Sequence, residues 1–396
     1  MLRQGYKQTE IGVIPEDWEV KELGVLGDVR MCKRVFQNQT SEYGDIPFFK
    51  IGTFGKEPDA YISRKHFEEL KLKFSYPKFG EILISAAGTI GRTVVYNGEE
   101  SYFQDSNIVW IENREDIISN KLLKYVLEVV KYNTEGGTIQ RLYNNILKST
   151  LFVCPPLAEQ EAIASALSDA DAWIDSLEQF IAKKRLIKQG AMQTLLTPQE
   201  DWEVKKLGEV ADVYRGGSPR PIQDYITNKS NGINWIKIGD TSSSGKYITS
   251  ANEKIIPEGE KNSRKVFVGD FLLSNSMSFG RPYILKIEGC IHDGWLVLQN
   301  YKETFNTEFL YYLLTSKYML DQYKSKAAGS SVLNLNKELV SSVEVLIPSL
   351  SEQERIARIL SDMDAELEAL EQQLAKARQI KQGMMQELLT GRIRLV

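Results

Sequence analysis

The residues best suited to acid–base or nucleophilic chemistry are few in this chain of 396 residues. Only two histidines are present, His66 and His292. His292 precedes Asp293, but no nucleophile stands at a recognisable spacing, which favours a structural or loop role for the pair. The chain has no Gly-Lys-Ser/Thr phosphate-binding loop, and Gly88-Thr-Ile-Gly91 lacks the dinucleotide-binding spacing. We therefore predict that this chain contributes no catalytic residue.

The cysteines argue against a metal or disulfide site. Cys32, Cys154 and Cys290 are odd in number and far apart, which fits neither a disulfide framework nor a zinc site. No apolar run approaches the roughly 18 residues of a membrane span, and the first residues lack a signal-peptide core. We expect a cytoplasmic protein with no metal site and no membrane contact.

The charge of the chain limits its partners. The net charge is −4, and basic and acidic residues are nearly balanced. A freestanding nucleic-acid-binding protein usually carries a basic excess. If this chain binds DNA, its basic residues must gather on one face, or a partner must supply part of the phosphate contact.

The elements that would position any polar site are duplicated. The hexapeptide at 16–21, Glu-Asp-Trp-Glu-Val-Lys, returns unchanged at 200–205, and more than half of the residues at 155–197 are identical at 348–390. The inserts between these echoes, 30–154 and 214–347, share a pattern but few residues. Each copy is too long for a solenoid repeat and must be a domain with a connector. The predicted domains are residues 1–154 and 200–347, each followed by a long helix, at 155–199 and 348–396.

Both connectors predict long helices that pair with each other. Their apolar residues step alternately by four and three, which is typical of a coiled-coil seam. Two such helices joined through a domain would pair antiparallel. Ser351, three residues before Glu354, has the spacing of a capping box. The seam residues are Ile163, Leu167, Ala170, Ile174, Leu177 and Ile181 in the first helix, and Ile356, Leu360, Met363, Leu367, Leu370, Leu374 and Ala377 in the second.

The two inserts predict mixed α and β structure of one shared fold. Helical stretches are expected near 120–132 and 307–323. The predicted fold class is α+β, with two mixed domains related by pseudo-twofold symmetry and joined by two long antiparallel helices. The candidate strands are Ile46–Ile51, Glu81–Ser85, Thr93–Tyr96 and Ile108–Ile111, with counterparts Ile233–Ile238, Phe271–Ser274, Tyr283–Ile287 and Leu296–Leu298.

The repeated motifs resemble those of the specificity subunit of Type I restriction-modification enzymes. The resemblance rests on the Asp-Trp-Glu-Val-Lys openings, Arg215-Gly-Gly-Ser-Pro-Arg220, Trp235-Ile-Lys-Ile-Gly-Asp240, the Glu-Gln-Glu helix starts and the closing Lys381-Gln-Gly-Met-Met-Gln. The first insert departs from it at Met31-Cys-Lys-Arg34. The resemblance implies two target-recognition domains, each reading one half of a split, asymmetric double-stranded DNA site.

The resemblance also implies partners. Two methyltransferase subunits would dock on the helices, and motor-nuclease subunits would join them. No cofactor is expected on this chain, whereas the partner subunits would use S-adenosylmethionine, ATP and Mg. A partner that flips and methylates an adenine would explain the missing catalytic residues.

The duplication separates residues that hold DNA from residues that read it. The half-sites differ, so residues shared by both inserts cannot carry the difference. Lys50 and Lys237 precede Ile-Gly alike, and Arg92 and Arg281 follow glycine alike. Phosphate contacts position a protein without specifying sequence, so these four residues suit phosphate contact or scaffold. A surface ion pair or a solvated charge is the alternative for each.

Base-reading residues should lie where the inserts diverge within loops. Asn275 could bond an adenine edge through two hydrogen bonds, and Arg34 or Arg220 could bond guanine. The basic cluster at 183–188 is interpreted as a solvated helix face, and Trp18 and Trp202 as packing residues. The candidate readers are Arg34, Ser85 and Thr89 in the first insert, and Arg215, Ser218, Arg220, Ser274, Asn275 and Ser278 in the second.

Two other functions remain open at this point. One is the recognition subunit of a related restriction system that cuts on both sides of its site. The other is a coiled-coil scaffold with two ligand-binding domains and no DNA. Salt-dependent DNA binding beside a methyltransferase would separate the scaffold from the specificity subunit.

Overall fold

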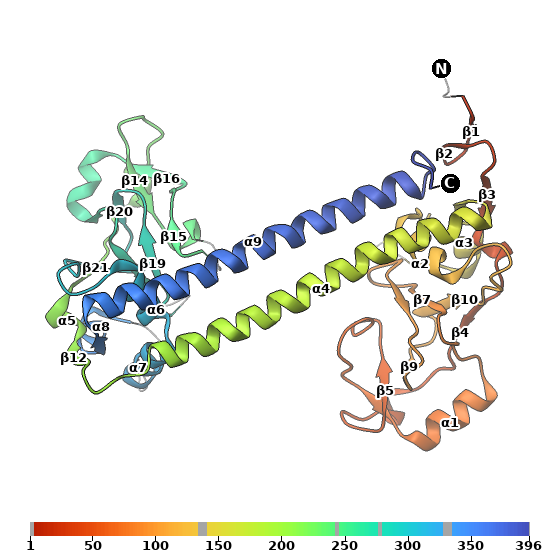
Figure 1. The fold of residues 1–396 in the computed structure, drawn as a ribbon, viewed down its shortest axis with the longest axis horizontal. Helices are drawn as coiled ribbons and strands as arrows, with labels where there is room; N and C mark the ends of the chain where they lie inside the picture. Colours follow the sequence, from red (N-terminus) through yellow and green to blue (C-terminus); the bar gives the residue numbers. More distant parts are fainter. Residues whose placement is uncertain (1–3, 134–140, 242–244, 276–278, 328–334, 396) are drawn as a thin grey trace. The chain divides into compact units, whose positions relative to one another are not determined.

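The structure, a computed structural model, describes residues 4–133, 141–241, 245–275, 279–327 and 335–395. They form two compact units, the first made of residues 1–178 with 373–396 and the second of residues 179–372. Two helices of 39 residues each, α4 (Leu157–Leu195) and α9 (Leu350–Leu388), contribute one part to each unit (Figure 1).

The first unit contains a mixed α and β domain that precedes α4 in the sequence. A four-stranded sheet of order β4-β10-β7-β8 lies beside a smaller sheet of order β6-β5-β9. The strand β11 returns to pair with β3 and leads directly into α4. The strands are β1 (Tyr6–Thr9), β2 (Gly12–Pro15), β3 (Glu19–Glu22), β4 (Val29–Met31), β5 (Ile46–Phe49), β6 (Tyr61–Ile62), β7 (Ile82–Ser85), β8 (Thr93–Val95), β9 (Tyr102–Phe103), β10 (Ile108–Ile111) and β11 (Leu151–Cys154). The helices are α1 (Arg64–Lys73), α2 (Asn120–Val129) and α3 (Asn144–Ser149), with short 3-10 turns at Leu23–Val25 and Gln37–Gln39.

The second unit repeats this plan in front of α9. A five-stranded sheet of order β13-β21-β18-β19-β15 accompanies a four-stranded sheet of order β16-β14-β20-β17, and β22 pairs with β12 before α9 begins. The strands are β12 (Glu203–Lys206), β13 (Asp212–Arg215), β14 (Ile233–Ile236), β15 (Tyr247–Ile248), β16 (Glu253–Ile255), β17 (Arg264–Val266), β18 (Phe271–Ser274), β19 (Pro282–Leu285), β20 (Gly289–Ile291), β21 (Trp295–Gln299) and β22 (Glu344–Ile347). The helices are α5 (Leu207–Val210), α6 (Thr307–Thr315), α7 (Lys317–Ala327) and α8 (Lys337–Ser341), with 3-10 turns at Ile222–Asp224, Ile238–Asp240 and Pro257–Asn262.

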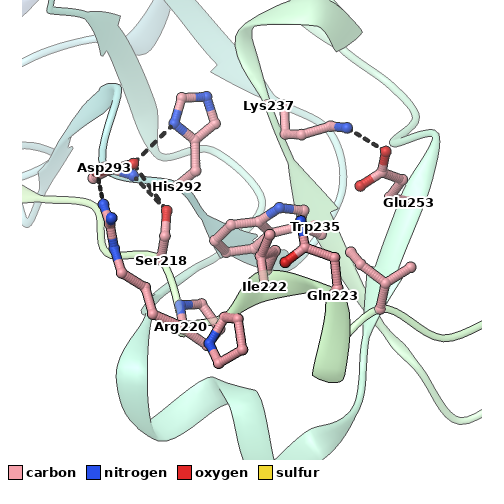
Figure 2. Close-up of a pocket in the computed structure, with 12 residues that line it drawn as sticks. Ser218, Arg220, Ile222, Gln223, Trp235, Lys237, Glu253, His292 and Asp293 are labelled. Carbon is pink, nitrogen blue, oxygen red and sulfur yellow. Dashed lines mark hydrogen bonds and ion pairs between the residues drawn. The ribbon is translucent and has the colours of Figure 1, made fainter.

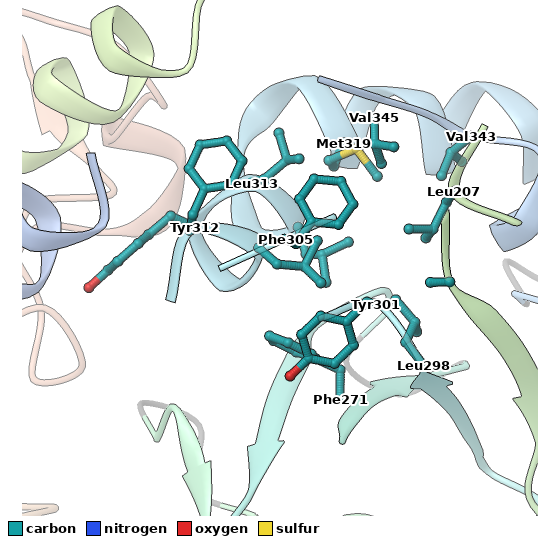
Figure 3. Close-up of a cluster of buried hydrophobic side chains, with 14 of the residues drawn as sticks. Leu207, Phe271, Leu298, Tyr301, Phe305, Tyr312, Leu313, Met319, Val343 and Val345 are labelled. Atoms are coloured by element: carbon teal, nitrogen blue, oxygen red, sulfur yellow. The ribbon is translucent and has the colours of Figure 1, made fainter. Parts of the chain in front are cut away.

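Each unit buries a core between its larger sheet, its short helices and the long helices. In the second unit, Phe271 and Leu298 of the sheet meet Tyr301, Phe305 and the helix α6 (Figure 3). The first residues of α9 join the same cluster through Ile356 and Leu360, and both are fully buried. Removing apolar side chains from water drives this packing, so the domain and its helix form one core.

A buried glutamine fixes the start of each long helix to its own domain. In the first unit, the Gln160 amide nitrogen donates to the carbonyls of Ile117 and Pro155 at 2.8 and 2.9 Å, and its oxygen accepts from the Ser119 amide at 3.1 Å. In the second unit, Gln353 donates to the Thr304 and Pro348 carbonyls at 3.0 Å each and accepts from the Asn306 amide at 2.8 Å. The two glutamines therefore satisfy the same backbone groups in both copies.

A repeated group of three side chains, the helix lock, joins the long helices within each unit. In the first unit, Lys381 of α9 pairs with Asp171 of α4 at 2.6 Å, and the Tyr125 hydroxyl donates to the same carboxylate at 2.8 Å. In the second unit, Lys188 of α4 pairs with Asp364 of α9, and Tyr312 donates to Asp364 at 2.6 Å. Each lock takes its aspartate from one long helix and its lysine from the other.

The ion pairs also give the direction of the helices within each unit. Arg378 pairs with Glu178 while Lys381 pairs with Asp171, so one residue number falls as the other rises. Lys184 and Lys188 likewise pair with Glu366 and Asp364 in the second unit. The helix segments therefore run antiparallel within each unit.

The predicted α+β fold class, with two mixed domains and two long antiparallel coiled-coil helices, is confirmed. The seam residues of both helices are buried or half-buried. The stretch 307–323 forms two helices, because the chain turns at Ser316 and its hydroxyl caps the amide of Met319. The predicted Ser351 cap is wrong: α9 begins earlier, and Ser349 accepts from the Glu352 amide. Among the described residues, no helix has the length and apolarity to cross a membrane.

Candidate nucleic-acid interface

Four of the predicted readers in the second domain converge on one aspartate. The Asp293 carboxylate accepts from the Ser218 hydroxyl at 2.8 Å and from the Arg220 guanidinium at 3.3 Å. The backbone carbonyl of Asp293 accepts from Arg215 at 3.3 Å and from the Asn275 amide at 3.1 Å. Three loops that are distant in sequence therefore meet at Asp293.

The electrostatics of this aspartate favour its charged form. The hydrogen bond from Ser218 lowers the pKa of Asp293 below its ordinary value, although partial burial opposes it. The neighbouring His292 ring is half-buried, and burial lowers its pKa, so it is neutral at pH 7. His292 Nδ1 accepts from the Gly294 amide at 2.7 Å. This contact holds the His292 ring against the backbone of its own loop.

The opening loop reaches Asp293 because glycine allows a close approach. A side chain at Gly216 would place its Cβ 2.0 Å from the carbonyl oxygen of His292. Real Cβ atoms do not come so near, so only glycine fits there. The Arg215-Gly-Gly-Ser sequence therefore lets the loop cross the end of β20 and present Ser218 and Arg220.

A cavity of about 1040 Å³ lies beside this cluster. Ser218, Arg220 and Asp293 line one side, and the nearly buried Trp235 is drawn between them and Lys237 (Figure 2). Lys237, which pairs with Glu253, lines the other side. The cavity combines guanidinium, ammonium, amide and aromatic groups, which are the side chains that contact phosphates and base edges.

The first domain has an aspartate at the same backbone position. The strand β9 pairs in parallel with β5 (Phe49 beside Phe103), as β20 pairs with β14 (Ile236 beside Ile291). Two residues after each pair stand Asp105 and Asp293. Asp105 accepts from the Arg34 guanidinium at 2.8 Å, so both domains tether their opening loop to this position.

The shared lysines occupy matching places. Lys50 pairs with Asp59 at 2.9 Å, and Lys237 pairs with Glu253. Both lysines are about two-fifths exposed or slightly less, at 42% and 35% of the side chain. Phosphate contact therefore stays a prediction for both, and each carries an ion pair that DNA would have to replace.

The shared arginines hold loop backbone. Arg92 donates to the Phe54 carbonyl at 2.9 Å, and Arg281 donates to the Gly245 carbonyl at 3.2 Å. These contacts match the scaffold role that the shared position also allowed.

The candidates Ser85, Ser274 and Asn275 are enclosed. Ser85 donates to the Thr89 carbonyl and accepts from the Arg92 amide, and it is 2% exposed. Ser274 is fully buried and Asn275 is 6% exposed, while Ser278 lies outside the described residues. Their contact with bases stays a prediction.

Three residues of the basic cluster at 183–188 form ion pairs with the other long helix. In the second unit, Lys184, Arg185 and Lys188 pair with acidic residues of α9. In the first unit, Trp18 is fully buried and its ring nitrogen donates to Glu159 of α4 at 2.8 Å, which confirms its packing role.

The described residues contain no group of three or more His, Cys, Asp or Glu side chains that could hold a metal.

A family model described as the type I restriction modification DNA specificity domain matches residues 15–188 and again 199–379. The chain belongs to this family. The two matches cover one domain with most of its long helix each, in agreement with the duplication in the sequence.

Relatives of known class support the family. The chain is 56% identical over 173 residues to a putative type I restriction enzyme specificity subunit of Haemophilus influenzae, a match that spans 43% of this chain and 45% of that protein. It is 25% identical to the putative type I restriction enzyme MjaX specificity subunit of Methanocaldococcus jannaschii, over 99% of this chain and 97% of that one.

Solved structures share the fold. The type I restriction-modification S subunit from M. genitalium superposes with a TM-score of 0.56 at 17% identity, over 98% of both chains. A chain from a study of complex assembly and conformational transition of the type I system gives a TM-score of 0.62 at 16% identity, over 96% of this chain and 99% of that one.

The sequence missed Asp105 and Asp293 as members of a specificity-subunit site. The available signal was that each insert has an aspartate shortly before an equivalent strand, Asp105 before β10 and Asp293 before β21. One extra residue in the first domain separates Asp105 from β10, so the two aspartates fall out of step until the strand register aligns them.

Proposed function

We propose that this chain is the sequence-reading, non-catalytic subunit of a type I restriction-modification complex. It reads a bipartite, asymmetric double-stranded DNA site, with one recognition domain for each half-site. The observation that carries the proposal is the pair of equivalent domains whose tethered opening loops differ in residue type. Arg34 stands in one loop, and Arg215, Ser218 and Arg220 stand in the other. An equal scaffold with different readers is what two different half-sites require.

The partners supply the chemistry in this proposal. Two methyltransferase subunits dock on the long helices and motor-nuclease subunits join them. S-adenosylmethionine, ATP and Mg are bound by those subunits and not by this chain. The balanced charge supports the proposal, because partners that contact phosphates relieve this chain of the need for a basic excess.

Reconstitution with methyltransferase subunits tests the function. The complex should methylate a DNA library at one split motif, read by methylation-aware sequencing, and this chain alone should neither methylate nor cleave. DNA affinity of the complex should fall steeply with salt. Methylation by the chain alone, or a complex with no affinity for DNA, would refute the proposal.

A further inference from the structure

The aspartate at the end of β9 and β20 is the shared feature from which a further role follows. Asp105 and Asp293 occupy the same backbone position in two domains whose surrounding sequences differ. Each carboxylate contacts an arginine of its own opening loop. Because the aspartate–arginine contact is present in both domains while the surrounding residues differ, its role should not depend on which bases a domain reads.

The tethered arginines remain open on their outer side. The Arg34 side chain is 57% exposed while the Asp105 side chain is 17% exposed. The Arg220 side chain is 80% exposed and Asp293 holds one of its terminal nitrogens. The guanidinium is a rigid planar fork, so fixing one edge fixes the direction of the donors on the other.

We propose that Asp105 and Asp293 are positioning residues for base reading, each orienting the arginine of its opening loop toward a guanine edge in its own half-site. This inference rests on the proposed function and names residues within it. An untethered arginine samples many rotamers and loses side-chain entropy on binding. A tethered arginine has already lost part of that freedom, and it offers a guanine O6 and N7 two donors in fixed geometry.

In the second domain the same residue coordinates several candidate readers. Asp293 fixes Ser218 and Arg220 through its carboxylate and Arg215 and Asn275 through its carbonyl. The carbonyl contacts survive a change of the side chain. Replacing the carboxylate therefore weakens its contacts with Ser218 and Arg220 and leaves the carbonyl contacts with Arg215 and Asn275 in place.

The test compares Asp293→Asn and Arg220→Lys in the complex reconstituted with methyltransferase subunits. Both variants should lose discrimination at one and the same base pair of one half-site, by about 5- to 150-fold, because a good two-bond arginine–guanine contact carries that much selectivity. The double variant should lose little more than either single variant. Binding to duplexes that differ by single base pairs, with methylated motifs from a DNA library, measures this loss.

Two matched controls separate positioning from folding. Asp105→Asn should relax specificity in the half-site read by the first domain and leave the half-site read by the second domain unchanged. Asp270→Asn alters another half-buried aspartate of the second domain, whose carboxylate accepts from the Phe267 amide, away from the cavity. It should leave the motif unchanged.

The outcomes are distinct. An unchanged motif in an assembled Asp293→Asn complex, an equal loss on every duplex, or a loss at a different base pair from that of Arg220→Lys would each overturn the inference. If Asp293→Asn fails to assemble, the first domain decides: Asp105→Asn must relax the same base pair as Arg34→Lys, and the inference is overturned if it does not. A wild-type complex with no split motif would instead remove the proposed function itself.

Discussion

At the scale of single residues, the shared arginines and the shared lysines have different partners: the arginines bind loop backbone, and the lysines pair with surface carboxylates that DNA phosphates could replace. Arg92 and Arg281 donate hydrogen bonds to loop carbonyls. Lys50 pairs with the exposed Asp59 and Lys237 with the partly exposed Glu253. Exposed ion pairs are worth little, so a phosphate can replace such a carboxylate at small cost.

Lys237→Ala should therefore weaken DNA binding on all sequences alike. Loss of one phosphate contact lowers the slope of log affinity against log salt by about one. Titrations of the complex at several salt concentrations measure the slope. Glu253→Gln is the control, because it removes the competing carboxylate and should keep or raise the affinity. An unchanged salt slope in Lys237→Ala would assign the lysine to its ion pair alone.

Asn275→Ala should relax specificity within one half-site, at a cost of ~1–3 kcal/mol for a lost two-bond contact to adenine. Asn275 is 6% exposed and donates to the Asp293 carbonyl, so the loop must open for its amide to reach a base. Affinity for a panel of single-base variants gives the answer. An equal loss on every variant would limit Asn275 to a structural role.

At the scale of elements, the long helices could be predicted because their apolar spacing is regular over many turns. The domain strands were predicted where short apolar runs lay between turns, as at Ile108–Ile111. The pairing of β9 with β5 could not be predicted, since two residues carry too little pattern. The place of Asp105 beside Arg34 could therefore not be predicted either. Gln160 and Gln353 were also missed, although a polar residue repeated in both copies was a usable signal.

Gln160→Ala should destabilise the first unit by about 1–3 kcal/mol, because it leaves buried carbonyl and amide groups without partners. Denaturant unfolding measures the change. Gln189→Ala, at an exposed site of the same helix, is the matched control and should change stability little. Equal effects of the two substitutions would contradict the role of Gln160 as the anchor of α4.

The helix lock predicts a pH dependence. Burial raises the pKa of Asp171, but the hydrogen bonds from Lys124, Lys381 and Tyr125 outweigh it and hold the pKa below its ordinary value. The unfolded chain then binds more protons than the folded one in the acidic range. The contribution of Asp171 is present above the unfolded pKa of about 3.9 and is lost as pH falls through the folded value.

Thermal unfolding from pH 7 down to pH 2 measures this dependence. Asp171→Asn should be less stable than the wild type at pH 7, and the difference should shrink as the pH falls. A difference that stays constant over the whole range would show that the charge of Asp171 does not contribute.

At the scale of the molecule, the two units have the same construction and different readers. Exchanging residues 30–154 for the insert of another family member should change one half of the methylated motif and leave the other half unchanged. The physical reason is that each domain keeps its own core and its own Asp-tethered loop. Methylation-aware sequencing reads the motif. The reciprocal exchange of 214–347 is the control, and a change in both halves after either exchange would contradict independent reading.

The division of the core between distant parts of the chain has a consequence for synthesis. The second unit is one continuous segment, 179–372, whereas the first needs residues 373–396 as well. Leu388 and Leu389 are buried in the same cluster as Trp18 and Ile163. The ribosome therefore delivers every residue of the second unit before the last apolar residues of the first. The first unit therefore begins to be translated before the second but is completed after it, because Trp18 and Ile163 meet Leu388 and Leu389 only once those residues have been made.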